Sequence, residues 1–128
     1  MTRDTPHGTI LVVDDNLDIR AFAKRFLETA GWAVVTAADG AEGLRIYEEY
    51  QSNIVLLLTD VMMPNINGLE LANRVLGMDS QLPVLFMSGS GYPGLECIAK
   101  PFRSVELLDR ISRALDADAH PVRTAPAA

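Results

Sequence analysis

Three carboxylates that are far apart in the sequence could share one site. Asp14 and Asp15 follow a short apolar run at residues 10–13, and this pair taken alone could equally be loop residues or helix caps. Asp60 follows a second apolar run at residues 54–59. If both runs are strands of a parallel sheet, their carboxyl ends form the edge where open α/β sheets bind ligands. Like charges gathered there repel, and a hard cation with oxygen ligands, best Mg²⁺, relieves the repulsion.

Two more polar side chains are expected at this edge. Lys100 follows a short apolar run at residues 96–99, and its ammonium could offset the acids and hold a phosphoryl oxygen. Ser88 follows a run at residues 83–87 and adds a hydroxyl, although a serine before Gly89 is by itself more simply interpreted as a turn residue. Separate loop residues would seldom all fall at strand ends, so the five side chains together favour a site.

The elements that position these residues alternate between short apolar runs and segments of helical period. This alternation is typical of a parallel sheet covered by helices on both faces. The expected strands are residues 10–13, 33–36, 54–59, 83–87 and 96–99. The expected helices are residues 19–27 ending at Gly31, 41–50, a segment after Gly68 to about residue 75, and 105–115. The expected helix caps are Asp15 or Asn16, Asp39 and Ser104. The predicted fold class is therefore α/β, a doubly wound five-stranded parallel sheet.

The bulk properties describe one compact domain. The chain has 128 residues, 48% hydrophobic and 22% charged, and its net charge of -6 disfavours direct binding to nucleic acid. Cys97 is the single cysteine, so no internal disulfide can form. The longest aliphatic run, residues 54–58, is too short for a membrane span, and residues 1–9 lack the apolar stretch of a signal peptide. We expect a soluble cytoplasmic protein with an N-terminal tail over 1–8, a folded domain over 9–116 and a disordered tail or linker stub over 117–128.

Over residues 9–115 the chain resembles the response-regulator receiver domains. The motifs that carry the resemblance are Val12-Val13-Asp14-Asp15-Asn16, Thr59-Asp60-Val61-Met62-Met63-Pro64, Asn67-Gly68, Met87-Ser88-Gly89 and Lys100-Pro101-Phe102. In this order and spacing they are highly specific. The resemblance implies the flavodoxin-like receiver fold, with a cis peptide between Lys100 and Pro101, and a part in two-component signalling or a phosphorelay.

The resemblance also assigns roles to the candidate residues. Asp60 would accept a phosphoryl group from a phosphohistidine on a sensor histidine kinase or histidine phosphotransfer protein. Asp15, Asp60 and the backbone carbonyl of Met62 would bind Mg²⁺, with Asp14 contributing through water. Lys100 would pair first with the acids and then with the phosphate. Ser88 would be the switch hydroxyl that follows the phosphoryl group. Such a domain catalyses its own phosphorylation and controls partner binding, and is not a turnover enzyme.

Two departures from the family concern the segment between Ser88 and Lys100. The segment is too short and too rich in glycine and proline for the fourth helix that receivers usually carry, so we expect that helix to be absent or reduced to a turn. Cys97 stands where the family commonly has an aromatic residue that moves on activation. Tyr92 could substitute for that residue, although a plain surface role for it is the simpler interpretation. The output surface should therefore be unusual.

Three other functions compete with the phosphoacceptor. A phosphorylation-independent pseudo-receiver would keep the fold and act as a protein-interaction module. An aspartyl-phosphate phosphohydrolase needs a second acid two residues after the nucleophile, where this chain has Met62. The glycine pattern at residues 89, 91 and 94 matches a dinucleotide-binding loop, but Pro93 stands where its helix should begin. The protein could be a stand-alone receiver, which the short segment before residue 10 favours, or the terminal receiver of a larger kinase.

Overall fold

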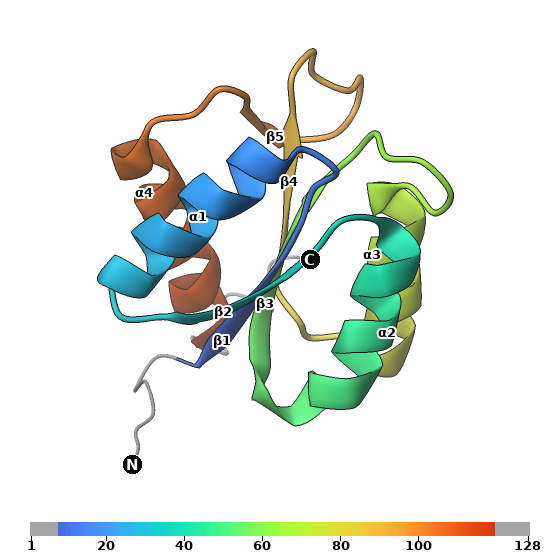
Figure 1. The fold of residues 1–128 in the computed structure, drawn as a ribbon. Coiled ribbons are helices and arrows are strands. Elements are labelled where there is room, and N and C mark those ends of the chain that lie inside the picture. Colours follow the sequence, from blue (N-terminus) through green and yellow to red (C-terminus); the bar gives the residue numbers. More distant parts are fainter. Residues whose placement is uncertain (1–7, 120–128) are drawn as a thin grey trace.

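The computed structural model describes residues 8–119 and contains one five-stranded parallel sheet with helices on both faces (Figure 1). The strands lie in the order β2-β1-β3-β4-β5. Their bounds are β1 Thr9–Val13, β2 Ala33–Ala37, β3 Ile54–Asp60, β4 Val84–Ser88 and β5 Cys97–Ala99. The helices are α1 Leu17–Thr29, α2 Gly40–Tyr50, α3 Gly68–Met78 and α4 Ser104–Ala119, with a 3-10 turn η1 at Gln51–Asn53. The predicted doubly wound α/β fold is confirmed.

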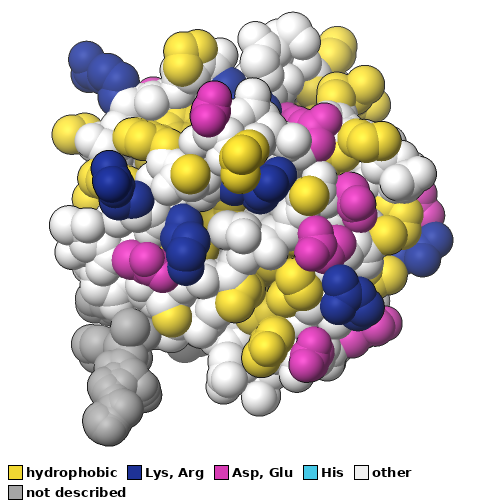
Figure 2. Space-filling model, viewed as in Figure 1, with side chains coloured by type: hydrophobic (Ala, Val, Ile, Leu, Met, Phe, Trp, Pro, Cys, Tyr) yellow, Lys and Arg dark blue, Asp and Glu magenta, His cyan; other side chains and the backbone are white. Residues whose placement is uncertain are grey.

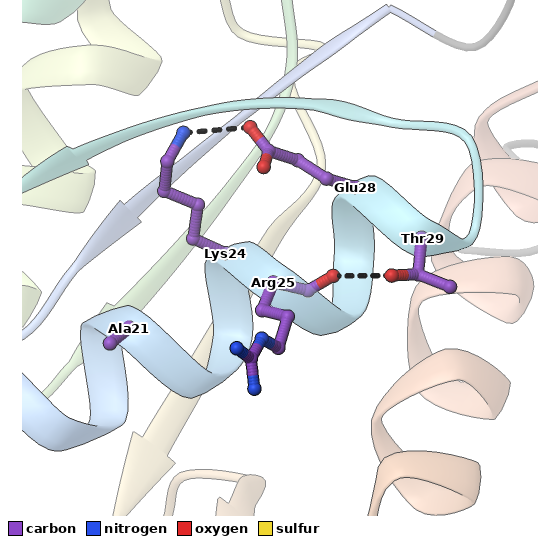
Figure 3. A pocket seen from close by; sticks show the side chains of 5 residues that line it. All are labelled: Ala21, Lys24, Arg25, Glu28 and Thr29. Atoms are coloured by element: carbon purple, nitrogen blue, oxygen red, sulfur yellow. Dashed lines mark hydrogen bonds and ion pairs between the residues drawn. The ribbon is translucent and has the colours of Figure 1, made fainter.

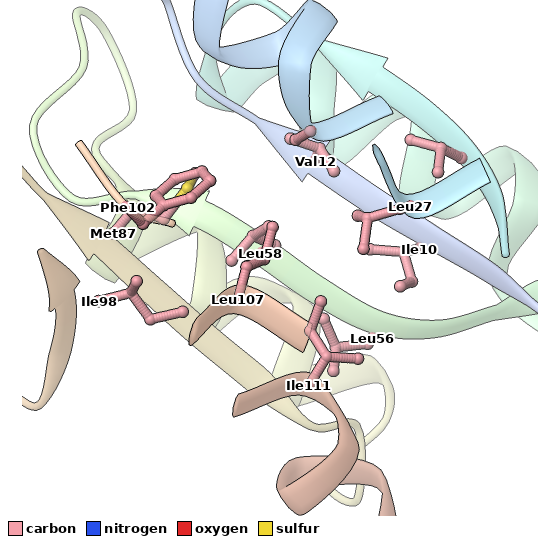
Figure 4. Packing of buried hydrophobic residues seen from close by; sticks show 12 residues of the cluster. Ile10, Val12, Leu27, Leu56, Leu58, Met87, Ile98, Phe102, Leu107 and Ile111 are labelled. Carbon is pink, nitrogen blue, oxygen red and sulfur yellow. The ribbon is translucent and has the colours of Figure 1, made fainter. Parts of the chain in front are cut away.

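The central strands are apolar along most of their length because each one faces two cores. In Figure 1, α1 and α4 lie on one side of the sheet and α2 and α3 on the other. On β3, Leu56 and Leu58 enter the core under α1 and α4, whereas Leu57 enters the core under α2 and α3. Figure 4 shows the first core, where Leu58 and Leu107 lie close together. Alternate side chains of a strand point to opposite faces, so a strand covered on both sides is apolar until it reaches the edge of the sheet, where β3 ends in Thr59 and Asp60.

Side-chain caps begin the first three helices where each chain segment leaves the sheet. Asn16 accepts the backbone N–H groups of Asp18 and Ile19, which makes it, rather than Asp15, the cap of α1. Asp39 caps α2 as predicted. Asn67 caps α3 by accepting the N–H of Glu70.

The last helix differs from its prediction at both ends and in its buried face. Ser104 is the first residue of α4 and not its cap, because the carbonyl of Arg103 already accepts the N–H of Leu107. The apolar spacing in residues 105–115 predicts a buried face of Leu108, Ile111 and Leu115. In the structure Leu107 and Ile111 are completely buried, whereas Leu108 and Leu115 are only partly so. The helix continues to Ala119, into the segment expected to be a tail. The remaining tail residues, 1–7 and 120–128, lie outside the described residues.

No helix joins β4 to β5 in the described chain, as predicted. Residues 89–96 make this connection with an antiparallel bridge between Tyr92 and Leu95 and with positive φ angles at Gly91 and Gly94. Parallel strands usually need a crossover of about a dozen residues or more, since the chain must run back along the sheet. The short connection brings the chain back along only part of the length of β4, and does not reach the start of that strand. Consequently β5 pairs with the last three residues of β4 alone, beginning with Phe86 opposite Cys97.

The molecular surface is mixed in character. Figure 2 shows acidic, basic and apolar side chains interspersed over one face. Between residues 8 and 119, none of the helices has the length and apolarity that a bilayer crossing requires.

Replacing Tyr47 tests the packing of the core under α2 and α3. Tyr47 is completely buried, and its hydroxyl has no hydrogen-bond partner among the described residues. We expect Tyr47→Phe to leave the free energy of unfolding unchanged or to raise it by about 1 kcal/mol, because an unpaired buried hydroxyl is removed. Tyr47→Ala should lower it by about 3–5 kcal/mol, since the ring volume is lost. Urea unfolding measures both, and a clear loss in Tyr47→Phe would contradict the unpaired hydroxyl.

Two glycines of α3 should respond to alanine in opposite directions. A Cβ at Gly68 would lie 2.1 Å from the backbone oxygen of Asp60, whereas a Cβ at Gly77 meets nothing within 4 Å. Gly68→Ala should lower the free energy of unfolding by about 1–3 kcal/mol, because the loop after Asp60 must move. Gly77→Ala should raise it by about 0.5–1 kcal/mol through helix propensity. Thermal unfolding of the two variants makes the comparison, and a tolerated Gly68→Ala would refute the close approach.

Candidate functional site: an acidic cluster at the carboxyl edge of the sheet

The structure brings the three predicted acids together. One carboxylate oxygen from each of Asp14, Asp15 and Asp60 lies within 4.8 Å of the other two. Asp14 is 0% and Asp60 5% exposed, while Asp15 is exposed. The cluster therefore has two carboxylates inside the protein and one facing solvent, so it is open to a ligand from one side.

Backbone hydrogen bonds to neighbouring strands hold the two buried acids in place. The N–H of Asp14, directly after β1, donates to the carbonyl of Ala37 at the end of β2, at 3.1 Å. Asp60 is the last residue of β3, and the N–H of Val61 donates to the carbonyl of Met87 in β4, also at 3.1 Å. The sheet itself thus fixes the position of both carboxylates, and they cannot separate without breaking strand pairing.

Lys100 bridges the buried acids as predicted. Its Nζ lies 2.9 Å from Oδ2 of Asp14 and 3.3 Å from Oδ1 of Asp60. Its backbone N–H donates to the carbonyl of Ser88 at 2.9 Å, which ties the end of β5 to the end of β4. The Lys100–Pro101 peptide is cis, as the resemblance implied. One ammonium against three carboxylates leaves the cluster with excess negative charge.

Burial and the neighbouring charges together shift the pKa values of two groups in the site. Burial raises the pKa of the Asp60 carboxyl above its usual 3.8, and the charge of Asp14 raises it further, while Lys100 opposes the shift. For Lys100, burial favours the neutral amine, but the hydrogen bond and charge of Asp14, together with Asp60, outweigh burial and raise its pKa. Lys100 therefore stays charged, and ionising Asp60 costs more free energy than ionising an isolated aspartate.

The donor set fits a hard cation. All the side-chain donors are carboxylate oxygens, and the solvent-facing Asp15 leaves room for water and a phosphate, as Mg²⁺ requires. Met62 lies two residues after Asp60 with its side chain 63% exposed, so its side chain does not fill the cluster. The arrangement suits a phosphoryl group held between a cation and the ammonium of Lys100.

Ser88 lies at the same edge but is bonded to the connection after β4 instead of the acids. It is 3% exposed, and its Oγ donates to the carbonyl of Gly91 at 3.2 Å and accepts the N–H of Ser90 at 3.3 Å. Tyr92 is 39% exposed, which agrees with the plain surface role. Cys97 is half-buried, and burial raises the pKa of its thiol, which argues against a reactive cysteine.

Reasoning from the sequence missed one contact at the cluster. Nη1 of Arg20 donates to the backbone carbonyl of Asp14 at 2.8 Å. The position of Arg20 in the sequence could have indicated this contact, because Arg20 lies in the first turn of the helix that begins directly after the two acids. A separate pocket of about 530 Å³ lies on α1 (Figure 3). None of the predicted site residues lines it; its lining residues are Ala21, Lys24, Arg25, Glu28 and Thr29.

Comparison with known proteins gives one consistent family. A family model described as response regulator receiver domain matches residues 10–112. The response regulator receiver protein CpdR of Brucella abortus is 34% identical over 117 residues, which are 83% of this chain and 95% of that protein. The transcriptional regulatory protein PrrA of Mycobacterium tuberculosis is 34% identical over 116 residues, 83% of this chain but 49% of that protein. The chain spans about half the length of several curated relatives it matches.

Solved structures agree with this result. The receiver domain of the hybrid histidine kinase CckA is 39% identical, with a TM-score of 0.77 over 84% of this chain and 99% of that chain. A response regulator receiver domain protein from Clostridium thermocellum is 27% identical, with a TM-score of 0.76 over 85% of this chain and 94% of that chain. The acidic cluster fits the phosphoacceptor site of such domains. The chain belongs to the response regulator receiver domains of two-component signal transduction.

Proposed function

We propose that this domain accepts a phosphoryl group on Asp60 from a phosphohistidine of a sensor histidine kinase or histidine phosphotransfer protein, and that phosphorylation controls binding to a downstream protein. The observation that carries the proposal is the ammonium of Lys100, which lies within 3.3 Å of Asp60 and 2.9 Å of Asp14. A carboxylate with a cation poised beside it, at a solvent-open edge, suits transfer of a dianionic group.

The proposed chemistry is an in-line displacement. An Oδ atom of Asp60 forms a bond to phosphorus while the bond between phosphorus and the donor's imidazole nitrogen breaks, and the electron pair of that bond stays on the nitrogen. Lys100 neutralises negative charge on the phosphoryl oxygens as the bond forms. The domain contributes these groups to its own phosphorylation and, we infer, to the later hydrolysis, and is not a turnover enzyme.

Asp14, Asp15, Asp60 and the backbone carbonyl of Met62 are proposed to hold Mg²⁺. When bound, the ion supplies charge neutralisation on the phosphoryl oxygens. The excess negative charge of the cluster supports this assignment, because Lys100 alone does not balance three carboxylates.

Ser88 is proposed to follow the phosphoryl group. To do so its hydroxyl must leave the carbonyl of Gly91, which would free the connection between β4 and β5 to adopt another conformation. The downstream partner would then recognise this connection in place of the helix that is missing.

Histidine kinases present their phosphohistidines in the cytoplasm, so the proposal places the domain there, without direct contact to nucleic acid or membrane.

Phosphorylation by a small donor tests the proposed function. We expect one phosphoryl adduct in the intact mass after incubation with acetyl phosphate or phosphoramidate and Mg²⁺. The adduct should be absent from Asp60→Asn, which lacks the nucleophilic carboxylate, and from wild type in excess EDTA. Lack of an adduct in wild-type protein that retains its fold would reject the phosphoacceptor and support the phosphorylation-independent interaction module.

Replacing Asp60 should stabilise the metal-free fold. Because the folded-state pKa of Asp60 is raised, its ionisation opposes folding at every pH above that value, and the penalty fades as the pH falls toward the usual 3.8. We expect Asp60→Asn to have the higher free energy of unfolding at neutral pH without metal, with a difference that shrinks in acid. Added Mg²⁺ should stabilise wild type more than the variant.

Asp18→Asn is the matched control for this comparison. Asp18 is an exposed acid in the first turn of α1, outside the cluster. Its loss should lower stability slightly, by about 0.3–1 kcal/mol, because a carboxylate near a helix N-terminus is favourable. Chemical unfolding with and without Mg²⁺ compares the three proteins. A less stable Asp60→Asn in metal-free buffer would show that the ionised Asp60 carboxylate does not oppose folding.

A further inference from the structure

Every polar atom of Asp14 is hydrogen-bonded. Its N–H donates to the carbonyl of Ala37, and its Oδ1 accepts the N–H of Asn16 at 2.8 Å. Its Oδ2 accepts from Lys100 at 2.9 Å, and its backbone carbonyl accepts from Nη1 of Arg20 at 2.8 Å. The last of these contacts belongs to the peptide that joins Asp14 to Asp15, and so acts on the next residue as well.

Asp15 depends on its backbone for its position. It is exposed, and among the described residues no hydrogen bond or ion pair holds its carboxylate, yet one of its oxygens lies within 4.8 Å of those of Asp14 and Asp60. A peptide unit is planar, so the direction of the Asp14 carbonyl sets the orientation of the whole unit up to the Cα of Asp15. A group that holds this carbonyl therefore also sets where the Asp15 side chain starts.

The position of Arg20 in α1 explains its reach. Helical side chains lean toward the N-terminus of their helix, and Arg20 is one turn beyond the capping residue Asn16, so its guanidinium extends back over the turn that carries the acids. A cation near a helix N-terminus opposes the helix dipole. None of the ion pairs among residues 8–119 includes Arg20, so its short polar contact at this end of the helix is the hydrogen bond to the Asp14 carbonyl. The benefit of placing Arg20 near the start of α1 is therefore its hydrogen bond to the backbone carbonyl of Asp14.

We propose that Arg20 is a positioning residue of the cation site, which fixes the Asp14–Asp15 peptide so that the Asp15 carboxylate faces Asp60. This inference rests on the proposed binding of Mg²⁺. A positioning role and a purely electrostatic role have opposite consequences. If Arg20 acted only through its charge, its removal would strengthen cation binding, because a nearby positive charge repels Mg²⁺. If it positions Asp15, its removal weakens binding.

Calorimetric titration with MgCl₂ separates the two roles. Arg20→Met keeps the aliphatic stem and removes the donor, and we expect its Mg²⁺ affinity to fall about tenfold, as with other groups that orient metal ligands. Lys24→Met is the matched control. Lys24 lines the same groove on α1 as Arg20 but pairs with Glu28, as Figure 3 shows, at a distance of 2.7 Å. Its hydrogen bonds among the described residues go to Glu28 and to the carbonyl of Val34, not to Asp14. Its affinity should be unchanged or slightly higher. Equal or tighter binding by Arg20→Met would overturn the proposal.

Hydrogen exchange in metal-free protein gives a second readout. The Asn16 N–H, bonded to Oδ1 of Asp14, should exchange faster in Arg20→Met than in wild type and in Lys24→Met, because the turn loses one of its restraints. Wild type that fails to bind Mg²⁺ would reject the cation site of the proposed function. The exchange arm still tests Arg20 in that case, since unchanged protection of Asn16 in Arg20→Met shows that Arg20 does not hold the turn.

Discussion

Asp14 and Asp60 bring like charges into a part of the protein that water reaches poorly, where repulsion is stronger than in solvent. Strand pairing through β2 and β4 keeps these acids from moving apart, and Lys100 offsets only part of their charge. The free energy of this repulsion is therefore carried by the sheet and not by two side chains alone. Any cation or phosphoryl group that enters the cluster changes the balance of forces at the ends of three strands at once.

The fold and most of the site could be predicted because both follow from burial. A strand covered on both faces is apolar along its whole length, so the runs ending at Asp14 and Asp60 stand out from the polar loops. Parallel strands place their carboxyl ends at the same edge of the sheet. The order of strands in the sequence therefore predicts that Lys100 lies near acids that are far from it along the chain. The absent helix was equally visible, since glycine and proline in a short connection leave no room for helical turns.

Other features depend on tertiary contacts that leave no pattern in the sequence. Helical periodicity does not separate Leu107 from Leu108, and the choice depends on how the chain enters α4 after the buried Phe102. Phe22 has the spacing of a core residue, but it is 43% exposed and lies against Phe102, 5.8 Å away between ring centroids. The contact of Arg20 could not be predicted from residue types, because Arg20 donates to a backbone carbonyl and every residue has one.

The short connection between β4 and β5 also bears on self-association. A strand at the edge of a sheet exposes unpaired backbone groups, and a long, flat edge can template aggregation. Because the connection delays the start of β5, this edge offers three residues, Cys97–Ala99. At the opposite edge, Nζ of Lys24 lies 3.5 Å from the carbonyl of Val34 in β2, and a charged side chain there discourages pairing with another chain. Val84, Leu85 and Phe86 of β4 are only partly buried, yet the short β5 leaves little strand for a second molecule to extend.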